Sequence, residues 1–77
     1  MPHIIVKLAS GRSEQQKAQL TEQIVKSVVT ALNTEEQAVS VAIHDVKPED
    51  WAEQVYKPEI AGDWDSLYKK PGYNPFE

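Results

Sequence analysis

Residues 13–33, SEQQKAQLTEQIVKSVVTALN, carry the pattern that decides the fold. Apolar side chains recur in this stretch every three or four residues, which is the spacing of an amphipathic helix. They are Leu20, Ile24, Val28 and Leu32, flanked by Val25 and Val29. Ser13 and Gln16 have the spacing of a capping box, in which two side chains satisfy backbone N–H groups at a helix start. Asn33 is a favourable C-terminal stop, so the stretch predicts one long helix.

Two strand-like segments flank this helix. Apolar side chains alternate along residues 3–8 (HIIVKL), and the same alternation recurs along residues 39–46 (VSVAIHDV). A strand, a long helix and a second strand form a βαβ unit, in which the strands are parallel and the crossover is right-handed. The predicted fold class is therefore α/β.

The remaining residues, 47–77, predict a helical extension. Pro48 suits the first position of a helix, and acidic residues follow it in the first turn. The later part is rich in aromatic residues, which a disordered segment seldom contains, and we expect a second short helix over residues 63–70. The chain is expected to be a single domain, 1–77, with a βαβ core over residues 2–46.

Length, charge and composition exclude several classes of protein. The chain has 77 residues and a formal net charge of −4, which argues against nucleic acid as the main partner. No run approaches the roughly 20 apolar residues of a membrane span, and the first residues do not resemble a signal peptide. There are no cysteines and only two histidines, so neither a disulfide nor a structural metal site is expected. We expect a cytoplasmic protein.

Two residues are candidates for chemistry. Removal of Met1 would make the ring nitrogen of Pro2 a free secondary amine, and an apolar site lowers the pKa of such an amine. Arg12 follows a turn glycine, and a guanidinium can clamp a carboxylate with two parallel hydrogen bonds. Each residue alone has a plainer interpretation. Pro2 would permit methionine removal and blunt a strand edge, and Arg12 would be solvated or pair with Glu14.

The combination of motifs is more specific. PxIxVxL (2–8), GRSxxQK (11–17), a long helix and VSVAI (39–43) follow one another in register, and together they resemble the 4-oxalocrotonate tautomerase family. The resemblance covers residues 2 to 51. The C-terminal part, with KKPGY (69–73), looks like the dimeric enterobacterial branch of that family, whose members act on enols of aryl pyruvates.

This resemblance implies a tautomerase whose N-terminal proline takes a proton from an enol hydroxyl and returns one to carbon. The catalytic role then falls on Pro2 after removal of Met1, and binding of the substrate carboxylate falls on Arg12. The aromatic wall of the pocket, which is Phe in better-studied members, falls on Trp51. Because the chemistry is proton transfer, the resemblance implies neither a cofactor nor a metal.

One departure from the family pattern concerns Ser40. Hexameric members have a second functional arginine in the middle of the second strand, where this chain has Ser40. Loss of that cation disfavours dicarboxylates, so we expect a monocarboxylate enol with an aryl or apolar end, such as phenylenolpyruvate. We expect the Ser40 hydroxyl to donate a hydrogen bond to the enol or carbonyl oxygen of that substrate. His3, beside Pro2, could tune the site, although strand alternation turns it away from the face of Ile4.

A two-stranded sheet is not stable alone in water, and its open edges invite pairing. We therefore expect a homodimer that shares a four-stranded sheet. The bulky aromatic extension could obstruct the contacts between dimers of shorter relatives, so a hexamer is less expected. Two other functions stay open. One is hydration or dehalogenation of a small unsaturated acid, and the other is a non-catalytic oligomeric binding module in which Pro2 is incidental.

Overall fold

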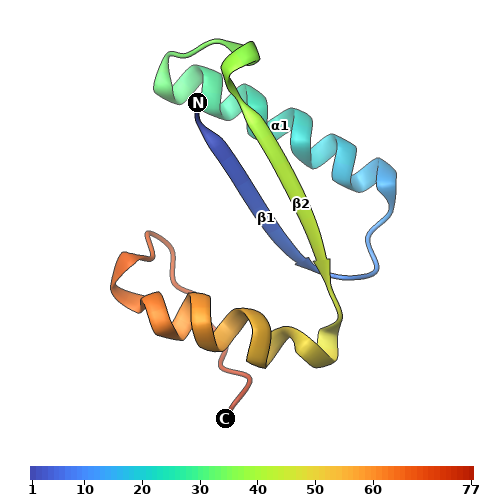
Figure 1. Ribbon diagram of the computed structural model, residues 1–77, viewed down its shortest axis with the longest axis vertical. Coiled ribbons are helices and arrows are strands. Elements are labelled where there is room, and N and C mark those ends of the chain that lie inside the picture. Colours follow the sequence, from blue (N-terminus) through green and yellow to red (C-terminus); the bar gives the residue numbers. More distant parts are fainter. The chain divides into compact units, whose positions relative to one another are not determined.

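The computed structural model describes all 77 residues, in two compact units that comprise residues 1–45 and 46–77. The N-terminal unit contains a strand, a long helix, a short 3-10 helix and a second strand. In chain order these are β1 (His3–Ala9), α1 (Glu14–Leu32), η1 (Glu36–Ala38) and β2 (Ser40–Val46). The two strands form one sheet and run in the same direction (Figure 1). The predicted βαβ arrangement is confirmed. That residues 1–77 form a single domain stays a prediction.

Both ends of α1 form as the sequence predicts. The Ser13 hydroxyl accepts a hydrogen bond from the backbone N–H of Gln16 at 3.1 Å, and the Ser13 N–H donates to the Gln16 side chain at 2.9 Å. Asn33 ends the helix in the left-handed conformation, with φ 53° and ψ 51°. The last residue of the predicted apolar stripe, Leu32, is 62% exposed, so the unit does not cover that end of the stripe.

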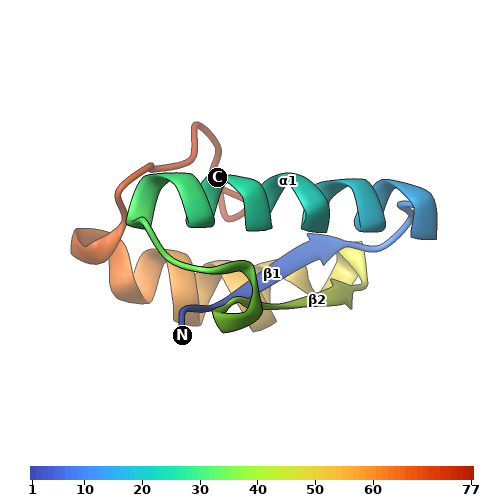
Figure 2. The same ribbon diagram turned by 90° about the horizontal axis from the view of Figure 1, so that it is seen from above.

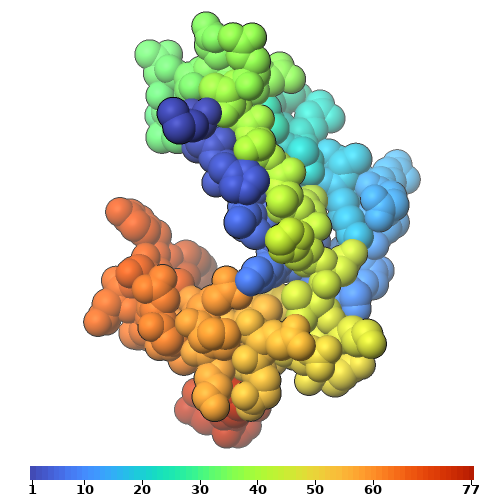
Figure 3. Space-filling model, viewed as in Figure 1, coloured from blue at the N-terminus to red at the C-terminus, as the bar shows by residue number.

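Helix α1 covers one face of the two strands (Figure 2). Its Lys17 pairs with Asp45 of β2, which identifies the side of β2 that faces the helix. Because side chains alternate along a strand, Val41 and Ile43 share that side, and Ser40 lies on the opposite one. Figure 3 shows β1 and β2 side by side on the face that α1 does not cover.

The N-terminal unit has no fully closed core. The only buried hydrophobic side chains of the chain are Val55 and Tyr56, which are 5% and 4% exposed, and both belong to the C-terminal unit. Every apolar side chain of β1, α1 and β2 remains at least partly accessible, and Ile5 is exposed. No helix of the chain combines the length and the apolar character needed to cross a membrane.

The C-terminal unit is helical at its start, as expected. It contains a 3-10 helix η2 (Pro48–Asp50), a π-helix η3 (Ala52–Ile60) and a 3-10 helix η4 (Ala61–Ser66). Pro48 occupies the start of η2. Within η3, Pro58 has no N–H to donate to the helical ladder. The helix expected over residues 63–70 is wrong in its second half, because Leu67 is extended, with φ −75° and ψ 122°, and ends the helical turns.

An aromatic cluster holds the last residues of the chain within this unit. The ring of Tyr56 lies 5.5 Å from the ring of Tyr73 and 6.1 Å from that of Phe76, measured between centroids. The Tyr56 hydroxyl also donates to the backbone carbonyl of Tyr73 at 3.2 Å. The C-terminal segment is therefore packed against η3 rather than free.

Candidate active site

Pro2 is half-buried just before β1 and is fixed to the start of β2. The backbone N–H of Ser40 donates to the Pro2 carbonyl at 3.2 Å, and the amino group of Met1 donates to the carbonyl of Ala38. With Met1 in place, the ring nitrogen of Pro2 belongs to a peptide bond and has no basic lone pair. The side chain of Met1 is 98% exposed, so nothing within the chain covers the residue that would have to be removed.

His3 and Ser40 form a polar pair beside Pro2. The Nδ1 atom of His3 lies 2.6 Å from the Oγ atom of Ser40, although the two residues are 37 positions apart in sequence. Both side chains are exposed, and strand alternation places Ser40 on the face of the sheet that α1 leaves open. The structure thus brings Pro2, His3 and Ser40 together at one end of the sheet.

Arg12 lies beyond the other end of β1. Gly11 has φ +125°, a conformation open to glycine, and it turns the chain so that Nη1 of Arg12 donates to the carbonyl of Ala9 at 2.9 Å. Arg12 is exposed and does not pair with Glu14, which instead contacts Lys17 at 3.3 Å.

Within one chain the structure does not bring Pro2 and Arg12 together. They are separated by the seven residues of β1, which span about 23 Å at roughly 3.3 Å per residue. A pocket that uses both residues therefore needs Arg12 from a second copy of the chain.

Trp51 follows η2 in the C-terminal unit and is half-buried. Its Nε1–H donates to the hydroxyl of Tyr73 at 2.8 Å, so this donor is already engaged. The indole ring is available as an apolar wall, but its N–H is not free for a substrate. No local sequence pattern predicts this bond, because Trp51 and Tyr73 are 22 positions apart.

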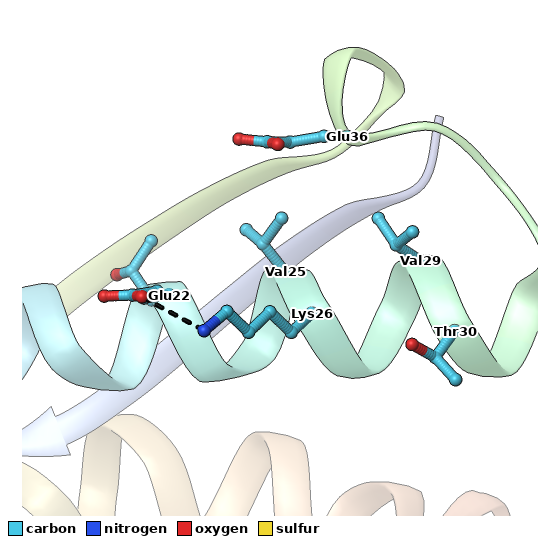
Figure 4. A pocket seen from close by; sticks show the side chains of 7 residues that line it. Glu22, Val25, Lys26, Val29, Thr30 and Glu36 are labelled. Atoms are coloured by element: carbon cyan, nitrogen blue, oxygen red, sulfur yellow. Dashed lines mark ion pairs between the residues drawn. The ribbon is translucent and has the colours of Figure 1, made fainter.

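A separate hollow of about 610 Å³ lies along α1 (Figure 4). Its lining residues are Thr21, Glu22, Val25, Lys26, Val29, Thr30 and Glu36. Lys26 pairs with Glu22 at 3.2 Å beside the two valines. None of Pro2, Arg12, Ser40 and Trp51 lines this hollow, which is a partly apolar surface that the chain leaves uncovered. No group of three or more acidic or histidine side chains is placed to hold a metal ion.

Comparison with known proteins shows that the chain is similar to tautomerases. Residues 2–57 match the family model described as "Tautomerase enzyme". The chain is 45% identical to a "Probable tautomerase" of Xylella fastidiosa, over 95% of this chain and 89% of the relative. It is 40% identical to tautomerase PptA of Cronobacter sakazakii, over 95% and 97% of the two chains.

A solved structure shares the fold. It is that of YwhB, a homologue of 4-oxalocrotonate tautomerase, which superposes with a TM-score of 0.65 at 26% identity. The superposition covers 70% of this chain and 88% of that one. The βαβ unit is thus the arrangement found in a 4-oxalocrotonate tautomerase homologue.

Proposed function

Because this chain belongs to the tautomerase family, we propose that it catalyses enol–keto proton transfer on a small enolpyruvate with an aryl or apolar end, such as phenylenolpyruvate. The isomerase class follows from the family itself. The observation that supports the proposed substrate and site residues is the extent of the family match, which begins at Pro2 and includes Arg12, Ser40 and Trp51. Relatives that are named tautomerases align with nearly the whole chain.

Pro2 is the proposed general base. After removal of Met1, the lone pair of its ring nitrogen takes the proton of the enol hydroxyl and leaves an enolate. The resulting ammonium then returns a proton to the substrate carbon, which completes the ketone and restores the neutral amine. Atoms and charge balance over the cycle, so the amine needs only to be unprotonated at the start. Partial burial of Pro2 supports this state, because removal from water disfavours a charged amine.

We propose that Arg12 binds the substrate carboxylate in the site of a second copy. The separation of Pro2 and Arg12 along β1 supports this assignment. In a two-fold dimer whose strands from different copies run antiparallel, the end of β1 in one copy approaches the start of β1 in the other. Such a dimer shares a four-stranded sheet and brings Arg12 of one copy to Pro2 of the other.

The incomplete core of the N-terminal unit also supports a homodimer. No side chain of the unit is fully buried, and Val25 and Val29 line an open hollow (Figure 4). A two-stranded sheet with one helix does not bury enough apolar surface to be stable alone. A second copy would supply both the further strands that the sheet needs and a surface that covers the exposed apolar side chains. The cytoplasmic location stays a prediction.

We assign Ser40 and Trp51 to the substrate-binding site. Ser40 stands at the Pro2 end of the sheet and carries no charge, which suits a substrate with a single carboxylate. Trp51 would supply an apolar wall for the aryl group, because its N–H is already bonded to Tyr73.

The test follows ketonisation of phenylenolpyruvate by its ultraviolet absorbance. Mass spectrometry first verifies that Met1 is absent from the purified protein. Pro2→Ala is compared with His44→Gln, which changes an exposed residue of β2 outside the proposed site. The proposal expects loss of activity only in Pro2→Ala. Full activity in that variant would exclude Pro2 as the base, whereas an inactive parent protein without Met1 would favour a non-catalytic binding module or another chemistry.

A further inference from the structure

The bond between His3 and Ser40 limits what the serine hydroxyl can do. A hydroxyl has one proton, and a neutral imidazole has one donor nitrogen and one acceptor nitrogen. With Ser40 Oγ 2.6 Å from His3 Nδ1, one of the two groups donates and the other accepts. If Ser40 donates, no hydroxyl proton remains for a substrate, and the ring proton lies on Nε2.

The surroundings of His3 leave its second ring nitrogen open to a ligand. Ser40 is anchored by its own backbone N–H, which donates to the Pro2 carbonyl, so its hydroxyl is held beside the ring. The Nε2 atom of His3 has no hydrogen-bond partner, and the side chain is exposed on the open face of the sheet. Consecutive Cα atoms are about 3.8 Å apart, so His3 is the nearest side chain along the strand to the proposed base.

We propose that His3 donates its Nε2–H to the enol or carbonyl oxygen of the substrate, and that Ser40 positions the ring by donating to Nδ1. This inference rests on the proposed tautomerase function. The partner bonded to one ring nitrogen decides which nitrogen carries the proton. A donor is what an oxygen that gains negative charge requires. In the opposite tautomer, the exposed nitrogen would present a lone pair to an anionic substrate.

The proposal gives the site a side-chain donor at the substrate oxygen that gains charge. While Pro2 removes the enol proton, charge builds on the oxygen, and the imidazole N–H stabilises it. The base and the donor are then adjacent residues, 2 and 3, and Ser40 fixes both of them from the neighbouring strand. Ser40 thus contributes to binding through His3 rather than by direct contact.

Two conservative variants of His3 distinguish a donor at Nε2 from a donor at Nδ1. The amide nitrogen of Gln reaches the position of Nε2, whereas that of Asn replaces Nδ1. We expect His3→Asn to lower kcat for phenylenolpyruvate by about tenfold or more, as for loss of a donor to a developing oxyanion, and His3→Gln to retain more activity. His44→Gln, on the same face of the sheet, should match the parent protein. Greater activity in His3→Asn than in His3→Gln would overturn the proposal.

A double-variant cycle tests whether Ser40 acts through His3. Ser40→Ala should lower kcat in the parent protein but have little further effect in His3→Asn, because the residue that it positions is already gone. Independent, additive losses would show that the two side chains act separately, and they would overturn the positioning role of Ser40.

A spectroscopic measurement decides the proton position without an assay. Nitrogen NMR of the full chain in a His44→Gln background reports a single imidazole. We expect a protonated Nε2 and an acceptor Nδ1, and a change of this pattern in Ser40→Ala. A proton on Nδ1 overturns the inference whatever the activity. A parent protein that is inactive on phenylenolpyruvate, with the expected NMR pattern, would instead contradict the proposed function.

Discussion

The indole N–H of Trp51 donates to the hydroxyl of Tyr73, with 2.8 Å between Nε1 and the phenolic oxygen. Tyr73 is itself held by Tyr56, whose hydroxyl donates to its backbone carbonyl and whose ring packs on its ring. The C-terminal segment therefore sets the orientation of the side chain that we propose as the pocket wall. A residue near the chain end thereby influences a residue 22 positions earlier.

Tyr73→Phe should loosen Trp51. The variant keeps the ring but leaves the indole N–H without its partner, which costs about 0.5–1.5 kcal/mol of stability for a neutral hydrogen bond. We expect a fall in the free energy of unfolding of this size, together with a change in Trp51 fluorescence in a Trp64→Phe background. Tyr68→Phe is the matched control, because Tyr68 is fully exposed. Equal effects of the two variants would show that the bond has no role.

Chains that retain Met1 should be inactive as tautomerases. The ring nitrogen of Pro2 is then an amide, and general base catalysis typically contributes about 10²–10⁴-fold in rate. Protein can be prepared with and without aminopeptidase treatment, and mass spectrometry gives the processed fraction of each sample. We expect the specific activity on phenylenolpyruvate to rise in proportion to that fraction. Equal activity of the unprocessed chain would remove Pro2 as the base.

Arg12→Ala should raise KM by about 10–100-fold, the range expected when a charged hydrogen bond to a carboxylate is lost. Arg12→Lys should recover only part of this loss, because an ammonium cannot form the two parallel bonds of a guanidinium. Steady-state kinetics with phenylenolpyruvate measures both. An unchanged KM in Arg12→Ala would place the carboxylate elsewhere.

Mixing Pro2→Ala chains with Arg12→Ala chains tests whether the two residues meet across copies. Each mixed dimer would contain one site with both residues intact, so random pairing should restore about a quarter of the parent activity in a symmetric dimer. The chains are unfolded together and refolded before the assay, with each variant refolded alone as the control. If activity does not return, Arg12 acts within its own chain.

Gly11→Ala should destabilise the protein because alanine disfavours the backbone conformation at this position. Gly11 has φ +125°, and a Cβ there would meet no atom within 4 Å, so the cost is conformational rather than steric crowding. A side-chain residue in a glycine-only region costs about 1–3 kcal/mol, which denaturant unfolding can measure. Gly72→Ala is matched, since its Cβ also enters open space and its φ is not in that region. Similar losses in both variants would contradict this explanation.

The pair of Lys17 and Asp45 should make stability depend on pH in the alkaline range. The hydrogen bond to Asp45 raises the pKa of Lys17 above its usual 10.5. The folded state therefore holds this proton more tightly than the unfolded state. The stabilisation is fully present below about pH 10.5 and is lost as pH rises through the folded pKa.

Asp45→Asn removes this stabilisation. The difference in melting temperature between the parent protein and Asp45→Asn should be constant from neutral pH to about pH 9 and should shrink above pH 10.5, where Lys17 loses its proton. The Glu14→Gln variant is a control, because Glu14 is exposed and only a secondary partner of Lys17. A difference in melting temperature that persists above pH 10.5 would show that Asp45 stabilises the protein by packing rather than by its bond to Lys17.

Local sequence signals predicted the elements of the N-terminal unit well. The Ser13–Gln16 capping box and Asn33 fixed both ends of α1, because these signals act within one turn of the helix. Strand alternation placed Ser40 on the face opposite to Val41 and Ile43, in agreement with the contact between Lys17 and Asp45.

The remaining features depend on contacts between distant residues, which no local pattern encodes. The bond between His3 and Ser40 requires the pairing of β1 with β2, and the bond between Trp51 and Tyr73 requires the chain to turn back after Ser66. The error over residues 67–70 has the same origin. The aromatic content of this part of the chain favoured an ordered helix, but Leu67 adopts an extended conformation and the segment beyond it packs through Tyr73.

If a second copy covers the apolar surface of the N-terminal unit, as we propose, the amount of folded enzyme depends on the protein concentration. A chain that closes its core with another copy is stable only while the copies find each other, so stability rises with protein concentration. Assays at high dilution would then report dissociation as well as turnover. A substitution far from Pro2, on the surface where copies meet, would lower the measured rate without altering the chemistry.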